Sequence, residues 1–355
     1  MSQVHAQRPR IGLIGTAGFA RVHGELLLDP EYRDRLRTEA VVVPPGEEET
    51  EMSLRLQAAG ARTYRNFPSF IEGERGRLDL CIIPTGIHWH ARMAVAALEA
   101  GMHVLVEKPL AGCMADARSI RAAEEKTGNW VAVAYQDAYT GTAEWLGKEL
   151  LAGRIGTLRR LKFLALWPRE EAYYTRNSWA GKMRAEGIEI RDFPFNNAMA
   201  HFIHLAFRLV APAGAGPDGI RILGADKYRA RDIETHDTAV AIAESDSGIR
   251  FWFGGSHAGN ELRHPELTVR GSSGTAAWGY EGSCVVRPDS GEPVTRRVPD
   301  HHAARRQMLD AVLKRLEDGR APVCDTTSAI RQVSFIEDFN RCGSTRPLPA
   351  VAKVD

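Results

Sequence analysis

Apolar and polar positions alternate in two different ways along this chain, and the change comes near residue 137. Before it, short apolar runs typical of buried strands are separated by stretches whose apolar residues recur at helical spacing. Strands and helices in strict alternation predict a mostly parallel sheet with helices on both faces. We expect strands at residues 10–15, 40–43, 78–83, 103–106 and 131–134, and helices near 19–28, 51–59, 91–100 and 115–126.

The pattern after residue 137 predicts a second, different sheet. A helix at 142–151 and a strand at 158–166 lead into an irregular stretch at 167–187 and a helix near 195–209. Apolar runs with hairpin spacing follow at 219–227, 238–244, 249–253, 262–270, 275–280 and 284–286, and helices near 302–316 and 327–340 close the chain. The expected fold class is α/β: a doubly wound parallel sheet in residues 1–136, then an α+β domain with a large open, mostly antiparallel sheet in residues 137–355.

The stretch RIGLIGTAGFARVH, residues 10–23, has the pattern of a strand, a tight turn and a helix. In dinucleotide-binding folds such a turn follows G-x-G-x-x-G and holds a pyrophosphate on the free N–H groups at the helix start. Here the aligned positions are Gly15, Ala17 and Ala20, with a further glycine at Gly18, and Ala17 is the departure from the pattern. The turn alone therefore fits an ordinary strand-turn-helix unit as well as a nucleotide site. The candidate cofactor-binding residues in it are Gly15, Thr16, Ala17, Gly18, Phe19 and Ala20.

Composition narrows the class of partner. The chain has 355 residues, 44% of them hydrophobic, and a formal net charge of +1, which suits two domains with cores and a small neutral ligand. Its lysines and arginines are scattered, so no nucleic acid is expected. Five cysteines without a C-x-x-C pair favour a reduced protein without structural zinc. Because neither a signal-peptide core nor a membrane-length apolar run is found, we expect a soluble cytoplasmic protein without membrane contact.

The most informative stretch is LDLCIIPTGIHWHARMAVAALEAGMHVLVEKPLA, residues 78–111. Its strand, His-bearing helix start, alanine-rich helix and E-K-P segment resemble the glucose-fructose oxidoreductase, inositol dehydrogenase and MocA (Gfo/Idh/MocA) family. The stretches ELLAGRIGTLRRLKF, NNAMAHFIH and ELTVRGSSGTAAW are also similar, so the likeness covers about residues 8–342. It implies a Rossmann domain, an open-faced sheet domain for substrate binding and homo-oligomerisation as a dimer or tetramer, NAD or NADP as cofactor, and usually a sugar or cyclitol substrate.

The resemblance also implies roles for single residues. Lys108 of the E-K-P segment would polarise the reacting hydroxyl, and His201 would act as its acid/base. Asn197 stands where the family usually has an aspartate, and its amide can orient the imidazole or hold a substrate hydroxyl but supplies no charge. Further cofactor contacts are expected from Pro84, Thr85, His88, Glu107 and Lys108, and substrate contacts from His204, Gln136, Trp167 and Arg169.

The histidines allow more than one interpretation. At about 100° per residue, the helix near 195–209 carries Asn197, His201, His204 and Arg208 on one stripe, and periodicity alone leaves open whether it faces solvent or a cleft. The family resemblance favours the cleft. No H-E-x-x-H or cysteine cluster accompanies the close histidine pairs at 88/90 and 201/204, so no metal is expected. His88 and His90 are placed at a helix entrance, lining the nicotinamide side or capping the helix.

The adenosine end of the cofactor site has a gap in the sequence. Pro44 and Pro45 occupy the place where a fold that prefers NAD puts an acidic residue for the ribose hydroxyls. The acids of residues 47–51 come later and are expected to form a solvated loop. Since no arginine stands at this place in the sequence to bind a 2′-phosphate, the sequence favours NAD over NADP.

Three functions stay open on the sequence. The favoured hypothesis is an NAD-dependent oxidoreductase that acts on a sugar, sugar acid or cyclitol. The second is a cofactor-retaining lyase or glycoside hydrolase that works through transient oxidation. The third is a non-catalytic sugar-binding protein on the same fold, which Ala17, Pro44 and Asn197 would permit.

Overall fold

The structure, a computed structural model, describes residues 8–211 and 219–348 and divides them into two compact units. Unit 1 contains the described part of Met1–Ala111, together with Ala115–Ala134 and Leu309–Thr326. Unit 2 contains Gly112–Met114 and the described parts of Tyr135–Met308 and Thr327–Asp355. None of the helices in the described ranges is long and apolar enough to cross a membrane.

Unit 1 is built on a six-stranded parallel sheet with the strand order β3-β2-β1-β4-β5-β6. Its register pairs Ile11 with Leu80 and Leu80 with His103, and all four residues of β4 are buried. Burial along a whole strand is expected where helices cover both faces of a parallel sheet. The strands are β1 (Arg10–Ile14), β2 (Arg37–Val42), β3 (Arg62–Tyr64), β4 (Leu80–Ile83), β5 (His103–Val106) and β6 (Val131–Val133).

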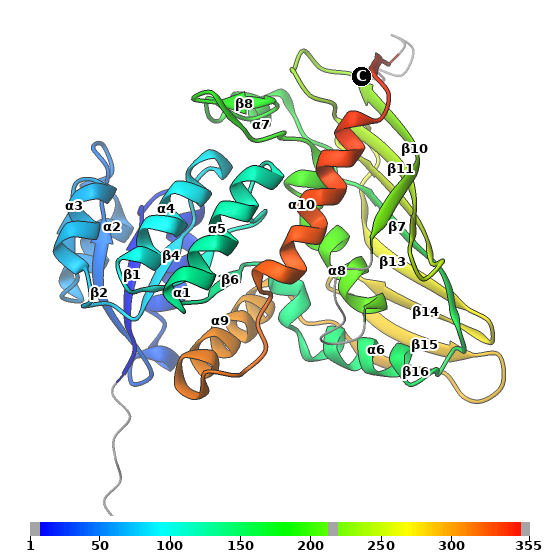
Figure 1. The fold of residues 1–355 in the computed structure, drawn as a ribbon, viewed down its shortest axis with the longest axis horizontal. Helices are drawn as coiled ribbons and strands as arrows, with labels where there is room; N and C mark the ends of the chain where they lie inside the picture. Colours follow the sequence, from blue (N-terminus) through cyan, green and yellow to red (C-terminus); the bar gives the residue numbers. More distant parts are fainter. Residues whose placement is uncertain (1–7, 212–218, 349–355) are drawn as a thin grey trace, which may run out of the picture. The chain divides into compact units, whose positions relative to one another are not determined.

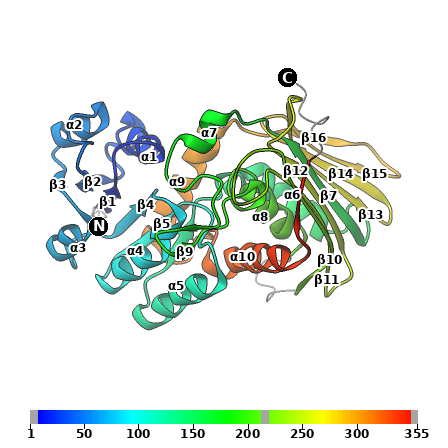
Figure 2. The same ribbon diagram turned by 90° about the horizontal axis from the view of Figure 1, so that it is seen from above.

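Helices α1 and α2 lie on one face of this sheet, and α3, α4 and α5 lie on the other (Figure 2). Side chains cap the N-termini of two of these helices. The Thr50 side chain accepts a hydrogen bond from the Ser53 N–H at α2, and the Asn66 side chain accepts one from the Ser69 N–H at α3. The predicted doubly wound fold is confirmed. The helices are α1 (Phe19–Leu27), η1 (Pro30–Tyr32), α2 (Glu51–Ala58), α3 (Phe67–Glu74), α4 (Ile87–Glu99) and α5 (Met114–Thr127).

Unit 2 is built on a nine-stranded sheet with the order β16-β15-β14-β13-β7-β12-β11-β10-β17. Within this sheet, only the pairs β7–β12 and β10–β17 are parallel among its described strands, so the predicted mostly antiparallel sheet is confirmed. The strands are β7 (Leu158–Leu166), β10 (Ile220–Arg229), β11 (Thr238–Ser245), β12 (Arg250–Ser256), β13 (Arg263–Gly271), β14 (Gly274–Gly279), β15 (Ser283–Pro288), β16 (Val294–Arg297) and β17 (Thr345–Pro347).

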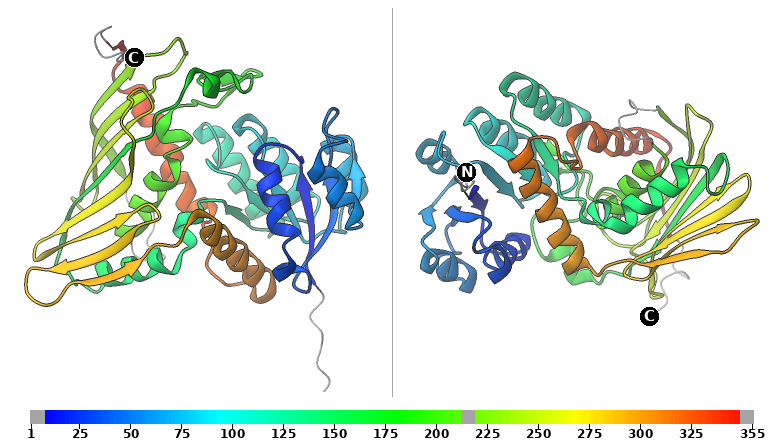
Figure 3. Two further views of the ribbon diagram at one scale, coloured as in Figure 1. Left: turned by 180° about the vertical axis from the view of Figure 1, so that it is seen from behind. Right: turned by 90° about the horizontal axis from the view of Figure 1, so that it is seen from below.

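One face of the unit 2 sheet carries helices and the other is open. Helices α6 (Gly141–Leu151), α8 (Ala200–Val210) and α10 (Thr326–Arg341) lie on the same face (Figures 1 and 3). Leu161 and Phe163 of β7 pair with Phe251 and Phe253 of β12, and all four are buried on the face that α8 contacts. Leu223 and Ile242 are more than two-fifths exposed. The predicted homo-oligomer stays a prediction.

The segment between β7 and α8 contains short elements that the sequence pattern did not reveal. They are α7 (Glu171–Thr175), β8 (Arg184–Ala185), β9 (Ile188–Glu189) and η3 (Pro194–Asn196). Two more elements complete the chain, namely η2 (Gln136–Tyr139) after β6 and α9 (His301–Asp318) after β16.

The expected helix near 195–209 is wrong at its start. The chain forms the single turn η3 at Pro194, Asn197 then takes φ −126° and ψ −93°, and the α-helix begins only at Ala200. Asn197 therefore does not share a helix face with His201. Its histidines His201 and His204 are not solvated, because every residue of α8 from Ala200 to Phe207 is buried, whereas Arg208 is half-buried.

Candidate functional site

The turn after β1 keeps the shape of a nucleotide-binding turn. Gly15 has φ +90°, and Gly18, the N-cap residue directly before α1, has φ +56° with ψ −127°, so both positions favour glycine. A Cβ on Gly15 would lie 3.3 Å from the Ala20 Cβ, which shows how closely the strand end and the helix pack. Ala17 is exposed, so its methyl group does not disturb this packing. The second glycine of the pattern is not needed for the backbone shape.

A carboxylate binds the amides of this turn. Oε2 of Glu47 accepts from the Thr16 N–H at 2.7 Å, the Thr16 hydroxyl at 2.8 Å and the Ala17 N–H at 2.9 Å. The Thr50 hydroxyl lies 3.1 Å from that of Thr16. The expectation of a solvated loop is therefore wrong for Glu47: the loop after Pro45 folds back and brings this acid to the turn. No local pattern signals such a contact, since 31 residues separate Glu47 from Thr16.

Glu107 links the E-K-P segment to the first helix. It follows the carboxyl end of β5, is 6% exposed, and lies 2.9 Å from Nε2 of His23 on α1. Burial acts to raise the pKa of Glu107, but the hydrogen bond and charge interaction with His23 and the charge of Lys108 outweigh it, so that the pKa is lowered. The Lys108 N–H donates to the same carboxylate at 3.2 Å. Lys108 is thus held at the carboxyl edge of the sheet, where ligands of such folds bind.

His90, near the start of α4, contacts the backbone at the same edge of the sheet. It is fully buried, and its two ring nitrogens lie 2.8 Å from the Pro109 carbonyl oxygen and 3.1 Å from the Thr85 carbonyl oxygen. Burial is the main cause that lowers the pKa of His90. The ring therefore connects the segment after β4 with the segment after β5. His88, in the first turn of α4, is also buried, as is Pro84, while Thr85 is half-buried.

In unit 2, His201 is paired with a carboxylate from another segment. Oδ2 of Asp137, in η2, lies 3.8 Å from Nδ1 of His201 in the first turn of α8, and both side chains are less than a tenth exposed. Burial raises the pKa of Asp137 to about 7. The sequence shows Asp137 only as one polar residue after the last strand of the first sheet, with nothing to connect it to a histidine 64 positions later.

Asn197 belongs to a different hydrogen-bond group. Its amide donates to Oδ1 of Asp192 at 2.7 Å and to the Tyr173 hydroxyl at 3.4 Å. The other oxygen of Asp192 accepts from the Gly181 N–H at 2.7 Å. These bonds fix Asn197 beside the α7 segment.

The expected substrate-binding residues lie at different depths in unit 2. His204 is 1% exposed, stacks on the Tyr135 ring with centroids 4.0 Å apart, and burial lowers its pKa to about 3. Gln136 is 8% exposed. Trp167 and Arg169 are half-buried, and the Arg169 guanidinium lies 5.6 Å from the Trp167 ring centre. The neutral, buried His204 acts as a packing group, whereas Trp167 and Arg169 keep partly accessible surfaces.

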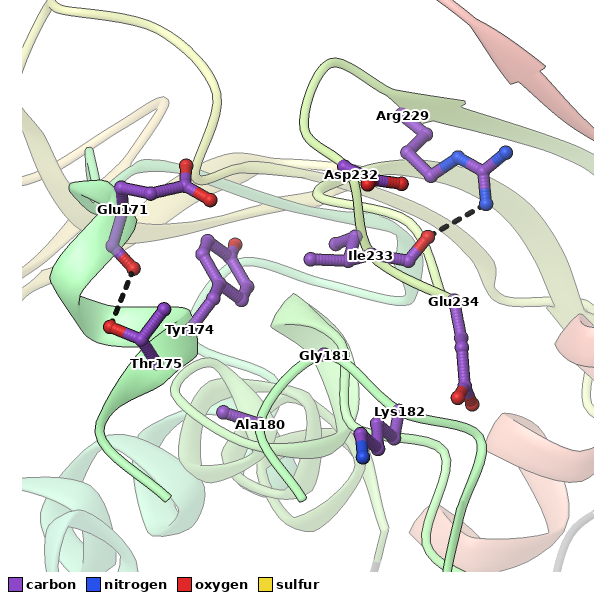
Figure 4. A pocket seen from close by; sticks show the side chains of 10 residues that line it. All are labelled: Glu171, Tyr174, Thr175, Ala180, Gly181, Lys182, Arg229, Asp232, Ile233 and Glu234. Atoms are coloured by element: carbon purple, nitrogen blue, oxygen red, sulfur yellow. Dashed lines mark hydrogen bonds between the residues drawn. The ribbon is translucent and has the colours of Figure 1, made fainter. Parts of the chain in front are cut away.

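A separate pocket of about 430 Å³ lies beside the β10–β11 connection in unit 2 (Figure 4). Charges of both signs surround it, and one of its walls is held by the Arg229 guanidinium, which donates to the Ile233 carbonyl at 2.7 Å. Tyr174 is the aromatic residue among the lining residues that come from the irregular stretch at 167–187. The lining residues are Glu171, Tyr174, Thr175, Ala180, Gly181, Lys182, Arg229, Asp232, Ile233 and Glu234, a set that does not include Asp137 or His201.

Metal ligands do not converge in the parts of the chain that the structure describes. Within residues 8–211 and 219–348, no group of three or more histidine, cysteine, aspartate or glutamate side chains is arranged to hold an ion. The close-spaced histidines have other surroundings, because His90 faces two carbonyl oxygens and His204 stacks on Tyr135.

Comparison with known sequences adds a family to these features. Residues 9–135 match the family model GFO_IDH_MocA, described as an oxidoreductase family with an NAD-binding Rossmann fold. Over 150 residues the chain is 31% identical to a D-apiose dehydrogenase of Paraburkholderia graminis, a match that covers 41% of this chain and 37% of that protein. The chain spans less than half the length of the curated relatives that it matches.

Two solved structures share the fold over nearly the whole chain. The WlbA dehydrogenase of Bordetella pertussis, solved with NADH and UDP-GlcNAcA, gives a TM-score of 0.76 at 20% identity and covers 94% of this chain and 96% of its own. KijD10, a 3-ketoreductase of Actinomadura kijaniata solved with NADP and TDP-benzene, gives 0.75 at 18% identity, with coverages of 97% and 100%. At these identities the likeness shows the fold.

Proposed function

Because this chain belongs to the GFO_IDH_MocA oxidoreductase family, as its E-K-P segment predicted, we propose that it is an NAD-dependent oxidoreductase acting on a carbohydrate. The reaction is hydride transfer between nicotinamide and a hydroxyl carbon of a sugar, sugar acid or cyclitol. The names of the matched proteins support this substrate class, since they include a dehydrogenase of D-apiose and structures solved with nucleotide-linked ligands.

The observation that carries the proposal is that the turn binds the carboxylate of Glu47. Three donors of Thr16 and Ala17 converge on one Glu47 oxygen, next to a helix start at which Gly18 takes a conformation suited to glycine. These residues fit a dinucleotide, because the turn and the N-terminus of α1 would hold its diphosphate and Glu47 would take a ribose hydroxyl. When bound, the cofactor supplies the group that accepts or returns the hydride.

Glu47 also supports NAD over NADP. A carboxylate fixed at the turn can accept hydrogen bonds from ribose hydroxyls, whereas a 2′-phosphate at the same place would meet a like charge. Glu47 thus fills the gap that Pro44 and Pro45 leave in the sequence pattern.

Two residues are assigned the proton chemistry. We propose that the Lys108 ammonium stabilises the negative charge that develops on the substrate oxygen, and that His201 removes the hydroxyl proton. The Glu107–His23 pair supports the position of Lys108, because it anchors the backbone on which that lysine is carried. The Asp137 carboxylate supports the role of His201, because an imidazolium formed next to it is stabilised.

A substrate screen tests this proposal. The purified protein is incubated with NAD and a panel of aldoses, sugar acids and cyclitols, and NADH formation is followed by absorbance. We expect sustained NADH formation with at least one class, and a loss of about 100-fold or more in kcat for Lys108→Ala and His201→Ala. Turnover of a carbohydrate without net NADH would contradict the proposal and favour a cofactor-retaining lyase. A rate that neither substitution changes would contradict the assigned roles.

A further inference from the structure

The buried pair formed by Asp137 and His201 joins two segments that lie far apart in the sequence. Asp137 sits in the single turn η2, which is closed by Thr140: the Thr140 hydroxyl donates to the Asp137 carbonyl oxygen at 2.8 Å. His201 is carried by the first turn of α8. Elements α8 and η2 contact each other directly, so the 3.8 Å approach of the carboxylate to Nδ1 is set by helix packing and not by a flexible loop.

Position 197 cannot provide this carboxylate here. The Asn197 amide is a donor to Asp192, which is itself 3% exposed. An aspartate at position 197 would place two carboxylates at the present 2.7 Å contact, where like charges raise each other's pKa and disfavour ionisation. The Asn197 side chain is therefore matched to the Asp192 carboxylate as its hydrogen-bond donor. A negative charge for His201 has to come from another segment.

We propose that Asp137 is the positioning residue for His201, with a carboxylate that faces the Nδ1 side of the imidazole and stabilises its charged form. This arrangement leaves Nε2 as the ring nitrogen that exchanges a proton with a substrate hydroxyl. The acid/base role of His201 rests on the function proposed above, whereas the carboxylate–imidazole pair stands on geometry alone. The logic is that of a carboxylate that fixes the tautomer of a catalytic imidazole and stabilises its charged form.

Several charged groups face the pair. Arg305 and His301 of α9 favour the ionised carboxylate, and Glu281, in the turn after β14, opposes it. The influence of Glu281 is tempered by His301, whose Nδ1 lies 2.6 Å from it. The Tyr135 ring meets the His201 ring edge-on, with centroids 6.1 Å apart.

The other tyrosine near the pair is Tyr280, in the same turn as Glu281. Burial raises its pKa, and the charge of Asp137 adds to that shift, so this phenol stays neutral near pH 7. The surroundings therefore leave Asp137, whose pKa burial raises to about 7, as the carboxyl group that changes its charge near neutrality beside His201.

A titration of the histidine rings tests the proposal without substrate or cofactor. Protein with isotope-labelled histidine is titrated by NMR, and the His201 signals are assigned by their loss in His201→Gln. Removing a carboxylate this close lowers the titration midpoint of its imidazole partner, so Asp137→Asn should shift the His201 midpoint down by about 1 to 2 pH units. Asp137→Glu, which keeps a carboxylate, should retain most of the wild-type midpoint.

The matched control is Asp246→Asn, which removes a carboxylate bound to the Gly219 N–H in the same unit. It should leave the His201 midpoint in place. An unchanged midpoint in Asp137→Asn, or an equal shift in the control, would overturn the proposal. If Asp137→Asn does not fold, Asp137→Ser removes the same charge and takes its place.

Turnover separates this inference from the proposed function. In an NAD-dependent assay, Asp137→Asn should lower kcat at least about tenfold and move the pH profile with the His201 midpoint, while KM for NAD is unchanged. A shifted midpoint in a protein that turns over no carbohydrate would retain the pair but remove the proposed function. A shifted midpoint with unchanged kcat would refute the positioning role.

Discussion

Replacement of Glu47 by glutamine tests which dinucleotide the turn accepts. The change removes one negative charge but keeps an oxygen that can accept from Thr16 and Ala17, so the turn should keep its shape. Two unit charges about 4 Å apart repel by about 1 kcal/mol in water and about 4 kcal/mol near a protein surface. Glu47 is half-buried, so a value within this range applies to its repulsion of a 2′-phosphate.

That repulsion corresponds to a preference for NADH over NADPH of about fivefold or more, because each 1.4 kcal/mol changes an affinity tenfold. Titration calorimetry with NADH and NADPH measures the ratio of the two dissociation constants. In Glu47→Gln the ratio should fall by about fivefold or more, chiefly through tighter binding of NADPH. Glu49→Gln, which removes an exposed carboxylate from the same loop, should leave the ratio at its wild-type value.

The reasoning would be refuted by a ratio that Glu47→Gln does not change. It would also be refuted if Glu49→Gln lowered the ratio equally, because the effect would then come from the net charge of the loop and not from the carboxylate at the turn.

Other predictions concern stability and the E-K-P segment. His23→Ala leaves the buried Glu107 carboxylate without its imidazole partner, so the free energy of unfolding by urea should fall by about 3 kcal/mol; a loss below about 1 kcal/mol would contradict the pairing. Because the pKa of Glu107 is lowered on folding, its contribution is complete above the unfolded value of 4.5 and is lost as the pH falls below it, so wild type and His23→Ala should converge in urea stability in acid. Gly18→Ala forces a side chain into φ +56° and ψ −127°, which should cost about 1 to 3 kcal/mol in urea unfolding and weaken NADH binding, and unchanged values in both assays would count against the strained turn. Lys108→Arg keeps a positive charge with a different shape and should leave NADH affinity within about threefold while lowering kcat, whereas equal loss of both would mean that Lys108 serves only to bind cofactor.

Local patterns predicted the long elements of the fold well. The predicted strand at 158–166 coincides with β7, because buried positions alternate with more exposed ones from residue 160 to residue 166. Short edge strands such as β3, β16 and β17 carry too few residues for a pattern and were missed. The start of α8 was misplaced because apolar residues at helical spacing continue through the η3 turn, which only the Pro194 position hints at.

The candidate site likewise contains parts that the sequence reveals and parts that it does not. The turn at Gly15 and the E-K-P segment are contiguous in sequence, so both could be located from the sequence. The contacts of Glu47 with Thr16 and of Asp137 with His201 join residues 31 and 64 positions apart, and they follow from how loops and helices pack. For that reason the sequence left an acidic loop without a role and a histidine without a carboxylate.

The measurement that tests the central claim most directly is the binding of NADH to the purified protein. Any nucleotide that copurifies is first released and identified by mass spectrometry, and the stripped protein is then titrated with NADH by calorimetry. The account predicts NAD or NADH in the released fraction, or saturable micromolar binding at one site per chain that Gly18→Ala weakens. Absence of both a copurifying nucleotide and any binding of NADH or NADPH would contradict the account and leave a carbohydrate-binding protein on this fold.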